Sequence, residues 1–270
     1  MGEEGEIAVP EREQAGARFT DLRARWENRA AEYQDAPVGV LFRGLAPALN
    51  RYLHRFHARV VCGQLLPLLP QGARVLDLGC GYGRIGQEML GHRTDLCLTG
   101  VDFAWPYCRR YQQNVAGSVC ADAARLPFAA GSFDAIVAIT VLMYVSPASR
   151  SAMMAQLIPL LKPGGQLLMI EPAQEVLEII ARLRPASAGH TTGGSGFGMR
   201  EFHSITGPEI MMLGAGGVPV FTAMLPVLQL LNRFPRTQGP VLAMLERLDV
   251  QFGALNRWSL HRWLLGQRVL

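Results

Sequence analysis

A glycine-rich turn follows a short, mostly apolar run of the sequence. The run Val75–Leu78 leads directly into Gly79–Gly83, and a helical pattern begins after it. Glycines at such a turn allow a sharp change of chain direction, and they let a ligand lie against bare main chain at the start of a helix. Three alternating glycines exceed what a plain turn needs. The pattern therefore predicts a loop that binds a nucleotide-like ligand.

Two aspartates near this turn indicate the charge of that ligand. Gly81, Gly83 and Gly86 match the dinucleotide pattern G-x-G-x-x-G. Asp102 follows about twenty residues later, where an acid that binds ribose hydroxyls is expected. Asp77 stands two residues before the first glycine, and its carboxylate would repel a pyrophosphate but attract an ammonium and a sulfonium. The charges therefore favour S-adenosylmethionine over a dinucleotide.

Alternating strand and helix patterns position this turn. Short apolar runs, typical of strands buried on both faces, lie at residues 74–78, 96–101, 135–140 and 166–170. Helical patterns at 85–90, 105–115 and 147–161 separate them. The alternation predicts an α/β fold with a doubly wound, mostly parallel sheet.

Weaker patterns flank this core. We expect a flexible tail over residues 1–18, an N-terminal helical cap over 19–70, the cofactor-binding core over 71–172 and a lid with further strands over 173–270. The cap has helical spacing from Thr20 and again over 48–66. Further helices are expected at 173–183, 208–213, 224–233 and 241–252, and strands at 218–223 and 260–269.

The composition excludes several classes of protein. The 270 residues are 49% hydrophobic and 18% charged, which excludes a disordered chain. The net charge of +4 gives no reason to expect nucleic acid as a partner. Five cysteines without C-x-x-C spacing favour a reducing cytoplasm over a disulfide framework or a zinc site. Residues 1–14 lack a signal-peptide pattern, and the longest apolar run, 217–231, is too short to span a membrane.

Five motifs in order resemble those of the class I S-adenosylmethionine-dependent methyltransferases, in their small-molecule and quinone-biosynthesis-like branch. They are Val75–Gly83, Gly100–Phe103, Cys120–Phe128, Ser132–Ala138 and Leu161–Leu167. The resemblance covers about residues 72–172 and implies a Rossmann-like fold with a seven-stranded sheet. It also implies an enzyme that transfers the methyl group of S-adenosylmethionine, with no metal ion.

The resemblance implies a role for each matching position. Asp77 and the glycine turn would hold the amino-acid end of the cofactor, and Asp102 would bind the ribose hydroxyls. Phe103 would cover the adenine, while Asp122 and the backbone beside it would bind the adenine edge. The predicted cofactor-binding residues are Asp77, Gly79, Cys80, Gly81, Gly83, Asp102, Phe103, Ala121, Asp122, Ala123, Thr140 and Tyr33.

The acceptor side is predicted from position alone. A base is needed only if the acceptor carries a proton on its reacting atom. The candidates beyond the carboxyl ends of the strands are Tyr144, Glu171, His190 and His203. Residues 187–212 form a candidate lid whose glycines, phenylalanines and methionines suit an adaptable apolar pocket. We expect a small, apolar acceptor, aromatic or polyketide-like, methylated at O, N or C.

Other functions stay open at this point. A methyltransferase of this kind could act on a peptide or on RNA, and C-terminal arginines such as Arg257 and Arg262 would suit RNA. Thr140–Met143 is not the Asn/Asp-Pro-Pro-aromatic tetrad of amino-methylating nucleic-acid enzymes. A nicotinamide-dependent oxidoreductase would also fit the glycine pattern, and a non-catalytic descendant would keep cofactor binding alone. The sequence predicts no particular oligomeric state.

Overall fold

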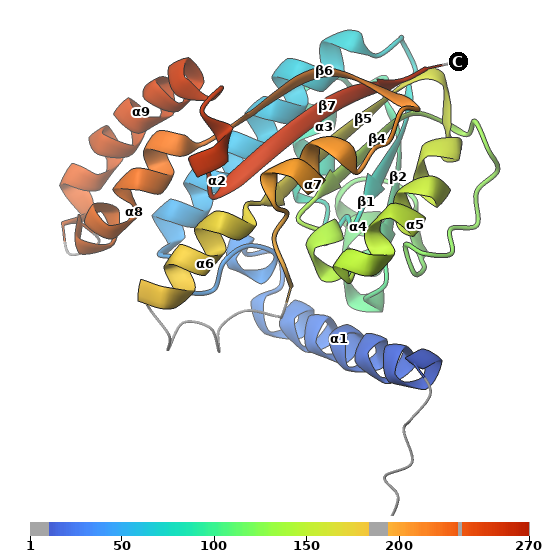
Figure 1. The fold of residues 1–270 in the computed structure, drawn as a ribbon, viewed down its shortest axis with the longest axis horizontal. Coiled ribbons are helices and arrows are strands. Elements are labelled where there is room, and N and C mark those ends of the chain that lie inside the picture. The colour runs from blue at the N-terminus through green and yellow to red at the C-terminus, as the bar shows by residue number, and fades with distance from the viewer. Residues whose placement is uncertain (1–10, 184–193, 232–233, 270) are drawn as a thin grey trace, which may run out of the picture.

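The computed structural model describes residues 11–183, 194–231 and 234–269, whose strands form one seven-stranded sheet (Figure 1). The strands are β1 (Arg74–Leu78), β2 (Cys97–Asp102), β3 (Ser118–Cys120), β4 (Phe133–Ile139), β5 (Leu161–Pro172), β6 (Ile210–Gly217) and β7 (His261–Arg268). Their order is β3-β2-β1-β4-β5-β7-β6. The first five run parallel, and β7 pairs antiparallel with β5 and β6. This confirms the predicted doubly wound, mostly parallel sheet.

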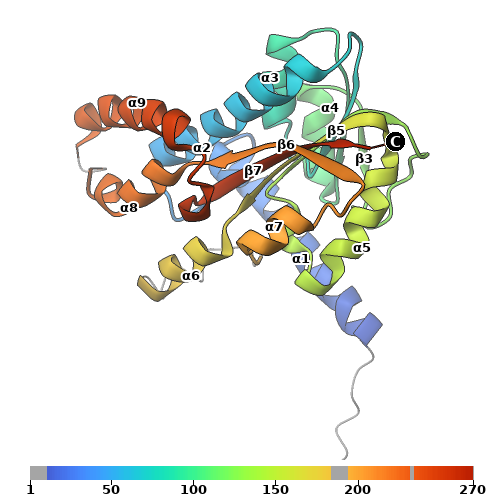
Figure 2. The ribbon, with the colours of Figure 1, turned by 45° about the horizontal axis from the view of Figure 1, so that its top comes forward.

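Helices cover both faces of the sheet, which explains the continuous apolar runs of its strands. The helices are α1 (Glu11–Tyr33), α2 (Pro47–Val60), α3 (Arg84–His92), α4 (Trp105–Asn114), α5 (Pro147–Leu157), α6 (Gln174–Leu183), α7 (Met199–Ser204), α8 (Pro219–Leu231) and α9 (Pro235–Phe252). Val75 of β1 packs with α2, α3, α8 and α9, whereas Leu76 and Leu78 pack with α5 and α7. In Figures 1 and 2, α8 and α9 lie side by side beyond the ends of β6 and β7.

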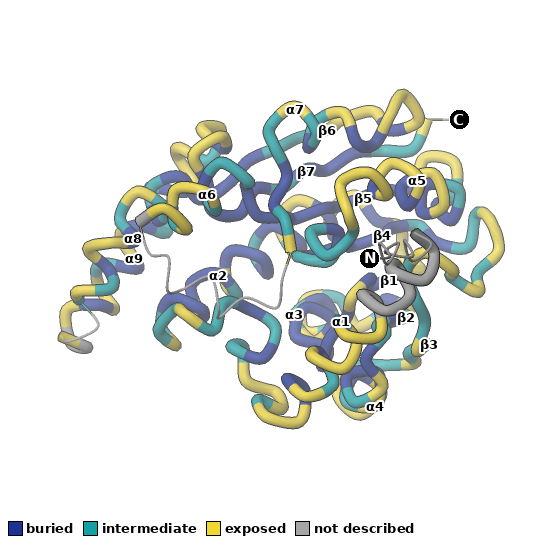
Figure 3. Tube along the Cα trace, turned by 60° about the horizontal axis from the view of Figure 1, so that its bottom comes forward, coloured by how far each residue is buried: buried dark blue, intermediate teal, exposed yellow. Residues whose placement is uncertain are grey.

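The predicted N-terminal cap is present, but it starts earlier than expected. Helix α1 begins at Glu11 rather than near Thr20, so the predicted tail is helical from residue 11. Residues 1–10 lie outside the described part of the chain. Trp26 and Ala30 of α1 are buried against Tyr82 and Tyr107, and the outward side of the helix is exposed (Figure 3). The cap therefore packs on loops at the carboxyl edge of the sheet.

Two predicted elements near the C-terminus are wrong. The helix expected at 208–213 is absent, because residues 210–217 form β6, and the strand expected at 218–223 is absent, because helix α8 already begins at Pro219 and runs on through the helix expected from 224. The glycines of β6 fit because the indole of Trp263 lies within 3.3 Å of where a Cβ of Gly214 or Gly216 would stand. In α8, Phe221, Leu225 and Leu228 are buried at helical spacing. A short apolar run does not distinguish a strand from a buried helix.

The predicted lid does not form an adaptable pocket in its described part. Residues 187–193 lie outside the described residues. Phe197 and Phe202 are fully buried in the core under β5, and Met211 and Met212 are half-exposed on the edge strand β6. Arg150 fixes the segment at 195–201, because it donates hydrogen bonds to Ser195, to the Gly196 carbonyl and to Glu201.

Candidate functional site

A crevice lies at the carboxyl edge of the sheet, where the strand order reverses between β1 and β4. It contains about 660 Å³ of space, including the part that is open to solvent. The loops after β1, β2 and β4 form its walls, together with the first turn of α3 and side chains from α1 and α4. Ligands of open α/β sheets bind at such switch points. The crevice is therefore the candidate site.

The glycine turn exposes main chain to this crevice. Gly79, Gly81 and Gly83 all have positive φ angles, of 65°, 52° and 92°. A Cβ on Gly79 would stand 2.2 Å from a methyl group of Val141, and one on Gly83 would stand 2.4 Å from a methyl group of Val115. Glycine is therefore required at both positions by backbone conformation and by packing.

Asp77 lies in the crevice as a buried carboxylate. It is 5% exposed, and its Oδ2 atom has no hydrogen-bond partner among the described residues. The pKa of Asp77 is raised to about 7, chiefly by burial; Arg84 and the neighbouring Tyr111 hydroxyl act to lower this pKa, and the charge of Asp102 acts to raise it. A buried carboxylate without a partner is costly unless a cationic or hydrogen-bonding ligand completes it. Asp77 therefore suits a positively charged ligand.

Asp102 joins the two loops that border the crevice. Its Oδ2 accepts a hydrogen bond from the backbone N–H of Gly81 at 3.1 Å, and its Oδ1 accepts one from Ala104 at 2.9 Å. Burial raises the pKa of Asp102 to about 6, although these N–H groups lower it. The carboxylate therefore lines the crevice in a fixed orientation beside the glycine turn.

Arg84 is a crevice residue that the sequence reasoning missed. It occupies the first position of α3, directly after the last glycine of the turn, and it is 9% exposed. Among the described residues that line the crevice, Arg84 is the one cation. Its place next to the motif was the available signal, because the first helical turn borders a ligand bound at the glycines.

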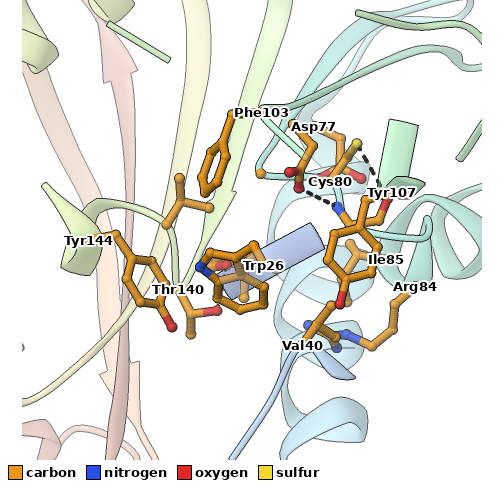
Figure 4. A pocket seen from close by; sticks show the side chains of 15 residues that line it. Trp26, Val40, Asp77, Cys80, Arg84, Ile85, Phe103, Tyr107, Thr140 and Tyr144 are labelled. Atoms are coloured by element: carbon orange, nitrogen blue, oxygen red, sulfur yellow. Dashed lines mark hydrogen bonds between the residues drawn. The ribbon is translucent and has the colours of Figure 1, made fainter. Parts of the chain in front are cut away.

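Aromatic side chains form the opposite wall of the crevice. Figure 4 shows Trp26 of α1 between Tyr144 and Tyr107, with Phe103 nearby. The rings of Trp26 and Tyr144 meet edge to face with centroids 5.3 Å apart, and Trp26 and Tyr107 lie 6.2 Å apart. The Trp26 Nε1 atom is buried without a hydrogen-bond partner among the described residues. Trp26 thus belongs both to a buried aromatic cluster and to the wall of the site.

Glu171 supports the crevice wall from behind. It is fully buried, and its carboxylate accepts hydrogen bonds from the backbone N–H groups of Val141, Leu142 and Met143 at 2.8–3.2 Å. Burial raises its pKa to about 8, although the three N–H groups lower it. The carboxylate caps the short helix Leu142–Tyr144 and so holds the loop that carries Thr140, which lines the crevice with a φ of 55°. Its oxygens therefore serve the loop and not the crevice.

The other acceptor-side predictions divide between the crevice and its surroundings. Tyr144 lines the crevice. His203 is half-buried on α7 beside the ring of Phe202 and is not a lining residue, and His190 lies outside the described residues. Tyr33 stands at the end of α1, away from the lining. The roles of His203, His190 and Tyr33 stay predictions.

The predicted adenine-binding turn lies beside the crevice. It follows β3, which pairs with the end of β2, and the Ala121 N–H donates to the carbonyl oxygen of Asp102 at 3.1 Å. Asp122 Oδ1 accepts a hydrogen bond from the Ala124 N–H at 2.9 Å, and Ala123 lies within this turn. The turn is therefore adjacent to Asp102 and Phe103, the two residues predicted to bind ribose and adenine.

Two further searches bear on what the site can hold. Within the described ranges, no group of three or more His, Cys, Asp or Glu side chains is arranged to hold a metal ion. None of the helices in the described part of the chain combines the length and the apolar character needed to cross a membrane.

Comparisons with known proteins agree with the motifs. Residues 75–165 match the family model of a methyltransferase domain. A tRNA (carboxymethyluridine(34)-5-O)-methyltransferase of Xenopus tropicalis is 35% identical over 108 residues, which are 40% of this chain and 17% of that protein. A demethylmenaquinone methyltransferase of Beutenbergia cavernae is 36% identical over 103 residues, which are 37% of this chain and 41% of that protein. The chain thus spans less than half the length of both relatives.

Solved structures share the fold over most of the chain. A putative methyltransferase of Haloferax volcanii, in complex with the Trm112 methyltransferase activator, superposes with a TM-score of 0.61 at 16% identity, covering 91% of this chain and 98% of the other. The N-methyltransferase NodS of Bradyrhizobium japonicum, in complex with S-adenosylhomocysteine, gives a TM-score of 0.55 at 14% identity, covering 92% and 98%. At these identities the likeness concerns the fold.

Proposed function

We propose that this chain, whose residues 75–165 match a methyltransferase domain, is a class I S-adenosylmethionine-dependent methyltransferase that transfers the methyl group of that donor to an O, N or C atom of a small, apolar acceptor. The observation that carries the proposal is the charge pattern of the crevice. The buried carboxylate of Asp77, the partly buried carboxylate of Asp102 and one arginine face a ligand that would bring a sulfonium, an ammonium, a carboxylate and two ribose hydroxyls.

The residues of the crevice fit the donor group by group. The Asp77 oxygen that has no partner in the described structure would accept the ammonium of the donor. Asp102, oriented by Gly81 and Ala104, would accept the ribose hydroxyls. The backbone exposed at Gly79–Gly83 would lie along the amino-acid part. When bound, the donor supplies a methyl group on a sulfonium, which is already a strong electrophile.

The protein's own contribution is then alignment and the exclusion of water. Helix α1 places Trp26 over the crevice, and Arg29 anchors that helix by donating to the Val38 carbonyl oxygen at 2.8 Å. Glu171 holds the Thr140–Tyr144 loop on the other side. Fixing two reactants in line in this way can contribute about 7–11 kcal/mol to lowering the barrier. Tyr144 is the predicted acceptor-side residue that lines the crevice, so it is our candidate to contact the acceptor.

The walls of the crevice favour a small acceptor over a macromolecule. Trp26, Phe103 and Tyr144 offer apolar ring surfaces, and the cation Arg84 is buried beside Asp77. A site for RNA would instead need exposed arginines or lysines at the rim, because phosphate contacts supply most of the affinity. We infer that the acceptor is a flat or compact apolar molecule with a nucleophilic atom at its edge.

Methyl transfer to tRNA is the second candidate, because a relative with that printed activity matches this chain at 35% identity over 108 residues. The two candidates are tested together by incubating the protein with methyl-labelled donor and either a panel of phenols and quinols or bulk tRNA. We expect label in the small-molecule arm. Transfer to tRNA alone would reject the small acceptor, and no binding of S-adenosylhomocysteine by calorimetry would reject the donor assignment itself.

A further inference from the structure

Arg84 is held from behind by two histidines of α2. Its Nη1 atom lies 3.0 Å from Nδ1 of His54, and its Nη2 atom lies 3.2 Å from Nδ1 of His57. His54 Nε2 is in turn 2.9 Å from Glu88, and His57 Nε2 is 2.8 Å from Nδ1 of His261. His57 and His261 are fully buried, and their rings stack with centroids 5.0 Å apart. The arginine thus rests on an ordered network that the proposed reaction does not itself require.

The chemistry of arginine determines the hydrogen positions in this network. A guanidinium only donates, so Nδ1 of His54 and Nδ1 of His57 must both accept. Each Nε2 then carries the hydrogen, and His57 donates to His261. A protonated imidazole has no acceptor to offer to Arg84, so the network requires neutral rings. In agreement, burial and the charge of Arg84 lower the pKa of His57 and that of His261, the latter to about 3.

The network leaves part of the guanidinium available to the crevice. A guanidinium has five N–H groups, and the two histidines accept from only two of its nitrogens. Arg84 lines the crevice next to Asp77, whose charge raises the pKa of Arg84 while burial lowers it. Neighbouring positive and negative side chains match an amino acid that carries an ammonium and a carboxylate on one carbon.

We propose that Arg84 binds the carboxylate of the methyl donor and that His54 and His57 position its guanidinium for this task. This role of Arg84 rests on the proposed function of methyl transfer. It specifies which side chain distinguishes the intact donor from a donor that lacks its carboxylate. Asp77 binds the ammonium that is attached to the same carbon as this carboxylate. Arginine suits this role because its rigid fork matches a carboxylate with two parallel hydrogen bonds.

A purely structural role for Arg84 predicts a different result. If Arg84 only balanced the buried charge of Asp77, its loss would weaken every adenosyl ligand that reaches the crevice, whether or not the ligand has a carboxylate. The test therefore compares two ligands, S-adenosylhomocysteine and its decarboxylated analogue, which keeps the adenosine, the thioether and the amine. The measured quantity is the ratio of their dissociation constants.

For the unsubstituted protein, we expect S-adenosylhomocysteine to bind at least tenfold more tightly than the decarboxylated analogue in calorimetric titrations. Arg84→Gln should weaken S-adenosylhomocysteine at least tenfold and change the analogue less than twofold. A tenfold change corresponds to about 1.4 kcal/mol. Equal losses for both ligands, or no loss for either, would overturn the proposal. If the original protein binds neither ligand, it is the proposed function that fails.

The positioning role of the histidines has its own test. His57→Asn keeps one acceptor and one donor on the side chain, whereas His57→Leu keeps neither. The preference for S-adenosylhomocysteine over its decarboxylated analogue should therefore fall less in the asparagine variant than in the leucine variant. His54→Ala removes the half-buried side chain that accepts a hydrogen bond from Arg84, and it provides the same test if the variants at position 57 do not fold. His92→Ala, on the exposed end of α3, is the matched control and should leave the ratio unchanged. A ratio that no variant in the network alters would refute the positioning role.

Discussion

Binding of the donor should depend on pH, because Asp77 must lose its proton to accept an ammonium. The pKa of Asp77 is raised to about 7 and that of Asp102 to about 6, so at pH 5.5 both are mostly protonated in the free protein. Bound to an ammonium and two hydroxyls, both carboxylates are favoured in the ionised form. Binding therefore releases protons below pH 7, and affinity should rise as the pH rises.

The magnitude follows from these two pKa values. Between pH 5.5 and pH 7.0 the cost of ionising Asp77 falls about 16-fold and that of Asp102 about fourfold, so the dissociation constant should fall about 60-fold. The amino group of the ligand has an ordinary pKa of about 7.7–8.0 and stays mostly protonated over this window. In Asp77→Asn the dependence should shrink to about fourfold, because only Asp102 still titrates.

Isothermal calorimetry with S-adenosylhomocysteine is the appropriate assay. Titrations in two buffers with different ionisation enthalpies report the protons released on binding, independently of the dissociation constant. Histidines shared by both proteins cancel when the pH profile of Asp77→Asn is compared with that of the original protein. A profile that is flat in the original protein, or one that the variant leaves unchanged, would refute the assignment of Asp77 to the ammonium.

Three further variants test separate parts of the site. Asp102→Ala should weaken S-adenosylhomocysteine at least tenfold in calorimetry, because charge-assisted hydrogen bonds contribute about 1.5–3 kcal/mol each; unchanged binding would contradict the placement of the ribose. Trp26→Ala should raise the KM for the acceptor more than the dissociation constant of the donor, and equal effects would remove Trp26 from the acceptor wall. Glu171→Ala should lower the free energy of unfolding by about 3 kcal/mol in urea titrations, since three backbone N–H groups lose their acceptor. Glu178→Ala, on the exposed side of α6, is its control, and equal stability of the two variants would count against the capping role.

The strands, and the meeting of Asp77 and Asp102 at one edge of the sheet, could be predicted because local patterns encode them. The run Val75–Leu78 is apolar on both sides and ends in glycines, so the strand and its turn could be located to the residue. Asp77 and Asp102 stand at the ends of adjacent parallel strands, which necessarily brings them to the same edge of the sheet. The register between adjacent parallel strands is therefore enough to predict that these two aspartates lie at the same edge of the sheet.

The missed elements were short or apolar without a distinctive period. Strand β3 is three residues long and partly exposed, so it gives no apolar run. Strand β6 exists because it pairs with β7, more than forty residues later, and nothing within 210–217 itself indicates that partner. Helix α8 is uniformly apolar at its start, and only the buried spacing of Phe221 and Leu225 distinguishes it from a strand.

Side-chain direction explains the errors within the site. Glu171 follows a buried strand, as a catalytic carboxylate would, yet its oxygens bond to backbone thirty residues earlier in the chain. Arg84 looks like an ordinary helix-start residue until α2 places His54 and His57 behind it. Both roles depend on contacts between elements distant in sequence, which periodicity and spacing do not encode.

The place of Trp26 in the sequence affects what the relatives can say about the acceptor. The methyltransferase match covers residues 75–165, which includes Asp77, Arg84 and Asp102 but not Trp26 or α1. The shared segment therefore contains the side chains proposed to bind the donor together with Phe103, Tyr107 and Tyr144, while Trp26 comes from before it. Relatives that methylate different acceptors can therefore share the matched segment without sharing the residues that precede it. Variation at Trp26, and not within the glycine turn, should consequently alter which acceptor is methylated while leaving the affinity for S-adenosylhomocysteine within a fewfold range.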